Sequence, residues 1–110
     1  MKKLLFINAS PRDESRSAAV ARAYLDAAVA ATPGLEVDMI RLWEEPLPDF
    51  DGNRANAKLA IITGQEHSGV QKTAWDEITS IAQRFIAADT YLFAVPMWNG
   101  GIPYRLKQYI

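Results

Sequence analysis

The stretch Leu4–Ile7, which reads LLFI, is followed by the turn-type cluster Asn8–Pro11, and together they indicate the fold. Consecutive apolar residues between polar flanks are typical of a strand buried on both faces of a parallel sheet. A secretory signal peptide is the alternative, since the chain starts with Met1-Lys2-Lys3. The apolar run is shorter than the roughly 7 to 15 residues of such a peptide, so a buried first strand is the better interpretation.

Strands and helices alternate along the rest of the chain. The patterns predict strands over Leu35–Leu42 and Thr90–Val95, and helices from Ser15 or Ser17 to about Thr32, over about Arg54–Ile62, over about Val70–Ala87 and from Ile102-Pro103 onward. This alternation implies right-handed crossovers and a parallel sheet, which is an α/β architecture.

Two further patterns predict which side chains face the core. The first helix carries an apolar stripe, expected to be its packed face, at Val20, Ala23, Tyr24, Ala27, Ala28 and Ala31. The second strand alternates, with Leu35, Val37 and Met39 on its apolar side. Such alternation predicts a strand with one face that is more solvated than the other, and a position near the edge of the sheet.

Length and composition define a broad class. The chain of 110 residues has the size of one domain, 1–110, with 49% hydrophobic and 23% charged residues. A net charge of −1 gives no basic excess for nucleic acid or an acidic membrane, and the absence of cysteine excludes disulfides and thiolate sites. We expect a cytoplasmic protein that binds neither nucleic acid nor membrane, with no metal site.

The first candidate binding segment follows the first strand. Ser10, Ser15, Arg16 and Ser17 bring hydroxyls and a guanidinium to the start of a helix, where unpaired amides and the positive dipole end favour a phosphate. The segment is neither a Walker loop nor a GxGxxG turn. The alternative is a helix cap with ordinary polar loop residues.

The second candidate segment follows the strand Thr90–Val95. Met97, Trp98, Asn99 and Gly100 place a thioether, an aromatic ring and an amide among glycines that permit close backbone approach. Polar backbone beside a flat apolar wall suits a planar heteroaromatic ligand. The alternative is a turn whose Trp98 covers the core.

These residues carry a family resemblance. The first strand with Asn8–Arg12 and Ser15–Ser17 resembles the phosphate loop of flavodoxin-like NAD(P)H:quinone oxidoreductases. Pro96–Asn99 and Gly101–Pro103, together with Leu106, Lys107 and Tyr109, resemble the flavin-ring loop of the FMN-dependent NADH-azoreductase branch. Gly100 departs from the pattern, because these azoreductases usually have Phe at this position. The resemblance therefore does not imply an aromatic wall beside the flavin.

The resemblance implies a fold, a cofactor and a reaction. The fold is a flavodoxin-like three-layer α/β/α architecture with a parallel sheet in the order 2-1-3, the beginning of the family's 2-1-3-4-5. Ser10 and Ser15–Ser17 would surround the FMN phosphate, and Met97–Gly100 would line the flavin ring. The flavin would take electrons from NADH or NADPH and reduce a quinone or an azo compound, so no side chain need act as acid or base.

The resemblance covers only the amino-terminal half of the family domain, whose other half would carry a third flavin loop and much of a homodimer surface. The strand Thr90–Val95 would then be an apolar edge that needs cover. We expect a homodimer, or a chain that is part of a longer protein. The alternatives are a flavodoxin-type electron carrier, which would usually present an acidic docking face, and an inactive fragment of the flavoenzyme.

Overall fold

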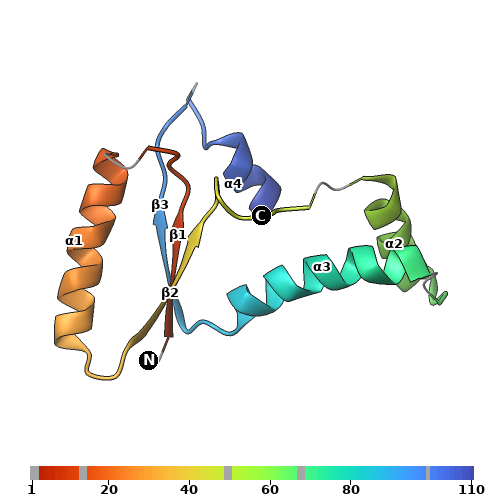
Figure 1. Cartoon of the computed structure of the whole chain (residues 1–110), viewed down its shortest axis with the longest axis horizontal. Helices are drawn as coiled ribbons and strands as arrows, with labels where there is room; N and C mark the ends of the chain where they lie inside the picture. Colours follow the sequence, from red (N-terminus) through yellow and green to blue (C-terminus); the bar gives the residue numbers. More distant parts are fainter. Residues whose placement is uncertain (1–2, 13–14, 49–50, 67–68, 99) are drawn as a thin grey trace. The chain divides into compact units, whose positions relative to one another are not determined.

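The structure, a computed structural model, describes residues 3–12, 15–48, 51–66, 69–98 and 100–110. Its elements follow one another as β1 (Lys3–Asn8), α1 (Arg16–Ala31), β2 (Glu36–Arg41), α2 (Gly52–Thr63), α3 (Gly69–Ile86), β3 (Thr90–Ala94) and α4 (Tyr104–Tyr109) (Figure 1). Every strand and helix predicted from the sequence is confirmed, with ends that differ by a residue or two. The chain divides into two units, residues 1–47 with 87–110 and residues 48–86, which are described in turn.

The first unit is built on β1. This strand pairs in parallel with β2 on one side and with β3 on the other, so the described strands form a sheet in the order β2-β1-β3. Ile7 lies opposite Ile40 of β2 and Phe93 of β3, and it is fully buried. The expected parallel sheet and strand order are therefore confirmed.

Helix α1 covers one face of this sheet. Leu4 and Phe6 of β1 form a buried cluster with Ala21 and Leu25 of α1 and with Ala94. Helix α1 begins after Ser15, whose hydroxyl accepts the amide of Ala18, and its buried residues are Ala18, Ala21 and Leu25.

The predicted packed face of α1 is wrong. Val20 is 72% exposed and Tyr24 57%, and Ala23, Ala27 and Ala31 are exposed as well. Two apolar stripes run along this alanine-rich helix about one residue apart, and helical periodicity alone does not choose between them. The stripe that packs consists of Ala18, Ala21 and Leu25, and its small alanines let the helix lie close to the sheet.

The other face of the sheet carries a second core cluster. Leu5 and Ile7 pack there with Ile40 and Leu42 from β2 and the residue after it, and with Leu106 of α4. Helices therefore lie on both faces of the sheet, as the three-layer prediction requires.

The predicted apolar side of β2 is only partly buried. Val37 is 39% exposed and Met39 37%, whereas Ile40, on the opposite side, is buried. The predicted edge position explains this, because β2 pairs only with β1 in the described sheet. Ile40 faces the side that α4 closes.

Strand β3 also lies at an edge of the described sheet. Its side chains alternate: Ala94 is buried, while Tyr91 is 37% and Phe93 42% exposed. The strand is apolar along its length, as the sequence shows, but in the structure only one of its faces is well covered.

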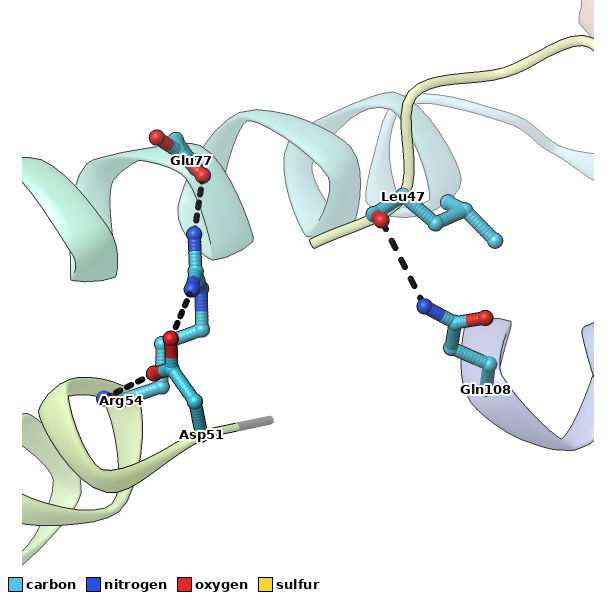
Figure 2. Close-up of polar contacts among 5 residues, drawn as sticks. All are labelled: Leu47, Asp51, Arg54, Glu77 and Gln108. Atoms are coloured by element: carbon cyan, nitrogen blue, oxygen red, sulfur yellow. Dashed lines mark hydrogen bonds and ion pairs between the residues drawn. The ribbon is translucent and has the colours of Figure 1, made fainter. Parts of the chain in front are cut away.

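Helix α4 is tied to the segment after β2 by polar side chains. Arg105 donates from Nε to the carbonyl of Leu42 at 2.7 Å and from Nη2 to the carbonyl of Glu45. Gln108 donates to the carbonyl of Leu47 at 3.4 Å (Figure 2) and accepts from Arg105. These bonds satisfy carbonyls that no strand partner reaches.

The second unit consists of α2 and α3. Asp51 caps α2, and the bond from the Arg54 amide is the largest cause that lowers the pKa of its carboxyl. The guanidinium of Arg54 bonds Asp51 at 3.0 Å and also Glu77 of α3, which joins the two helices (Figure 2). Gly64 ends α2 with a φ of 74°, in agreement with the predicted stop.

Among the described helices, none combines the length and the apolar character that a membrane crossing requires.

The bonds of Arg105 generate a prediction about stability. Replacing Arg105 by Met keeps an apolar stem but leaves the carbonyl of Leu42 without the Arg105 donor and that of Glu45 with the Leu47 amide, which should lower the free energy of unfolding by about 2 kcal/mol. Urea unfolding checks this through a lower midpoint at an unchanged slope. Lys107→Met, on an exposed position of the same helix, is the control and should cost much less. Equal effects of the two variants would contradict the role of the Arg105 bonds.

Candidate functional site

The candidate site lies at the carboxyl edge of the sheet in the first unit. Because β1, β2 and β3 are parallel, the segments that follow them, 9–15, 42–47 and 95–103, all start at this edge (Figure 1). Ligands of open α/β sheets bind in this position, beyond the carboxyl ends of the strands. Both segments predicted from the sequence are therefore where such a site would be.

The segment after β1 is shaped by its own polar side chains. The buried Asn8 accepts the amide of Ser10 through Oδ1 at 3.1 Å, and the Ser10 hydroxyl accepts the amide of Arg12 at 3.3 Å. Such local side-chain bonds define a turn without a glycine. The structure thereby gives the half-buried Ser10 a defined position at the start of the loop.

The same segment ends at the start of α1. The hydroxyls of Ser15 and Ser17 lie 2.8 Å apart, with Ser15 buried, Ser17 half-buried and Arg16 exposed. One hydroxyl hydrogen occupies this bond, so the other can be directed to a ligand. The amides of Arg16 and Ser17 belong to the first helical turn, where no helix carbonyl precedes them. Donors and the positive helix end together suit an anion.

The segment after β3 is a tight turn. Trp98 and Gly101 exchange two backbone hydrogen bonds of 2.9 Å, and Gly100 between them has a φ of 74°. That φ lies in the left-handed region, which favours glycine. The turn presents Met97, 79% exposed, and Trp98, 37% exposed, as an apolar surface beside backbone groups. Asn99, also predicted to bind, lies outside the described residues.

Trp43, on the segment after β2, is not among the residues predicted to form the site. Its indole Nε1 donates to the carbonyl of Ala9 at 2.8 Å. Its ring centroid lies 5.5 Å from that of Trp98, and Tyr104 meets the ring edge-on at 5.1 Å. Trp43 therefore contacts both predicted segments. Its position directly after a predicted strand is the sequence signal that could have singled it out.

The arrangement brings two chemically different groups of residues to one sheet edge. Ser10, Ser15, Arg16 and Ser17 supply hydroxyls, amides and a cation, whereas Met97, Trp98 and Gly100 supply an apolar surface and exposed backbone. A ligand with an anionic end and a flat ring would match both groups. This match is compatible with FMN.

Comparisons with known proteins agree with this fold. A family model described as "Flavodoxin-like fold" matches residues 2–110. Two curated relatives named FMN-dependent NADH:quinone oxidoreductase, from Ruegeria pomeroyi and Desulfotalea psychrophila, are 47% and 42% identical. Both alignments cover 100% of this chain, and they cover 54% and 52% of the relatives respectively.

Solved structures give the same result. An FMN-dependent NADH-azoreductase from Bacillus anthracis, in complex with FMN, superposes with a TM-score of 0.86 at 28% identity. An azoreductase from the same species gives 0.87 at 27%. Each comparison covers 99% of this chain and 53% of the other. The chain thus spans about half the length of the relatives that it matches, and its sheet, helices and family model show that it belongs to the family with the flavodoxin-like fold.

Proposed function

We propose that the chain forms the FMN-binding part of an oxidoreductase that takes electrons from NADH or NADPH and reduces quinones or azo compounds. One observation carries the proposal: the hydroxyl and amide groups at the start of α1 lie at the same sheet edge as the Trp98 turn. The names of the relatives support the same cofactor and reaction.

In this proposal the start of α1 holds the phosphate. The hydroxyls of Ser10 and of one member of the Ser15–Ser17 pair donate to its oxygens, the amides of the first turn add further donors, and the Arg16 guanidinium balances charge. A single terminal phosphate fits this short loop better than a pyrophosphate, for which a GxGxxG turn would be expected. The cofactor is therefore FMN rather than FAD.

The Trp98 turn lines the ring system. Met97 and Trp98 present apolar surface, and the backbone of Gly100 bonds the polar edge of the ring in this proposal. Bound FMN would supply two-electron transfer between the nicotinamide and the acceptor, so the side chains need only bind and orient it and exclude water. Cytoplasmic location is part of the same proposal.

A charge at the start of α1 tests the phosphate end. Ser17→Glu should weaken FMN binding by about tenfold or more, because like charges would lie next to each other, and should change riboflavin binding much less. Ser80→Glu, the same change on an exposed position of α3, is the control. Equal losses for both ligands in Ser17→Glu would remove the phosphate from this loop.

Replacement of Trp98 tests the ring end. An indole against the flavin quenches its fluorescence, so Trp98→Ala should partly restore the emission of bound flavin and weaken FMN and riboflavin alike, by about fivefold or more. Trp75→Ala on α3 provides the matched control. Unchanged emission and affinity in Trp98→Ala would show that this residue only covers the core.

We also propose that the protein is a homodimer, since β3 is an apolar edge strand of the described sheet with Tyr91 and Phe93 partly exposed. Sedimentation velocity at micromolar concentration should give the mass of a dimer. A stable monomer that unfolds cooperatively would contradict this part of the proposal.

A further inference from the structure

We infer that Trp43 is a positioning residue that fixes the phosphate segment through its indole N–H and the ring segment through its aromatic face. The inference rests on the proposed FMN site and adds to it a residue from the segment after β2. Trp43 would act on the ligand only through its two neighbours, Ala9 and Trp98.

The backbone beside Trp43 is held by the sheet. The amide of Leu42 donates to the carbonyl of Asn8 at 3.0 Å, which extends the pairing of β1 and β2 by one residue. Leu42 is fully buried, and its own carbonyl accepts from Arg105. The indole therefore projects from a segment with little freedom to move.

The polar contact of Trp43 acts on the start of the phosphate segment. Ala9 is fully buried, its amide donates to the carbonyl of Ala94 at 2.9 Å, and its carbonyl accepts from Trp43 at 2.8 Å. The peptide groups on both sides of Ala9 are thus fixed. Ser10, whose hydroxyl is proposed to bind the phosphate, is the next residue. Loss of the indole donor would leave a buried carbonyl without its partner and would loosen this loop.

The apolar contact of Trp43 acts on the ring segment. The indole planes of Trp43 and Trp98 are tilted by 47° at a centroid distance of 5.5 Å, which lies in the favourable range for aromatic pairs. The ring of Tyr104 packs edge-on against the indole of Trp43, at an interplanar angle of 85°. Trp98 is only 37% exposed, and Trp43 accounts for part of its cover. The two functions of Trp43 can therefore be separated by substitution.

Trp43→Phe removes the donor and keeps a ring. It should weaken FMN binding about fivefold, the factor that corresponds to one net hydrogen bond, and riboflavin binding by less than about twofold. Trp43→Leu removes both contacts and should weaken both ligands. Titration of flavin fluorescence measures the two affinities.

The control is Trp75→Phe on α3, which makes the same chemical change and should leave both affinities unchanged. If Trp43→Phe weakens FMN and riboflavin equally, or neither of them, Trp43 does not position the phosphate segment and the inference is overturned.

Absence of flavin binding to the wild-type chain would contradict the proposed function. In that case, a measurement without ligand tests whether Trp43 fixes the phosphate segment. Amide hydrogen exchange at Ser10 and Arg12 should be about fivefold faster in Trp43→Phe, while the amides of Trp98 and Gly101 should keep their protection. Unchanged exchange at Ser10 and Arg12 would overturn the inference.

Discussion

Strand β1 pairs on both sides, with β2 and with β3, and the first unit is built around this pairing. A strand that reads LLFI has no polar side chain to offer to water, so it is stable only with a neighbour at each edge and cover on each face. Strands β2 and β3 supply the pairing, and α1 and α4 supply the cover. Because all three strands run in one direction, their following segments meet at one edge.

Side chains then convert this edge into a defined site. Asn8 and Ser10 shape the first loop through bonds to amides, and the Trp98–Gly101 pair closes the turn after β3. Arg105 secures the segment after β2, from which Trp43 reaches both other loops. Few of these residues carry charge, which is consistent with a site whose chemistry comes from a cofactor.

Local patterns in the sequence predict the strands, the helices and their order, because apolar runs, caps and glycine stops are local signals. They do not predict which stripe of α1 packs, since Val20 and Leu25 lie on alternative apolar faces and the sheet makes the choice. Local patterns place Trp43 directly after a predicted strand, but they do not show that it contacts the two other segments. Its partners Ala9 and Trp98 are distant in sequence, and only the pairing of three strands brings them together.

In the proposed function, the segments after β1 and β3 form one site for FMN. The most direct measurement is a titration of FMN, and separately of riboflavin, with the wild-type chain. The fluorescence of the flavin reports the binding. Such a site should give saturable quenching with one FMN per chain and clearly weaker binding of riboflavin, which lacks the phosphate. Absence of saturable quenching, or equal affinity for the two flavins, would contradict the proposed site.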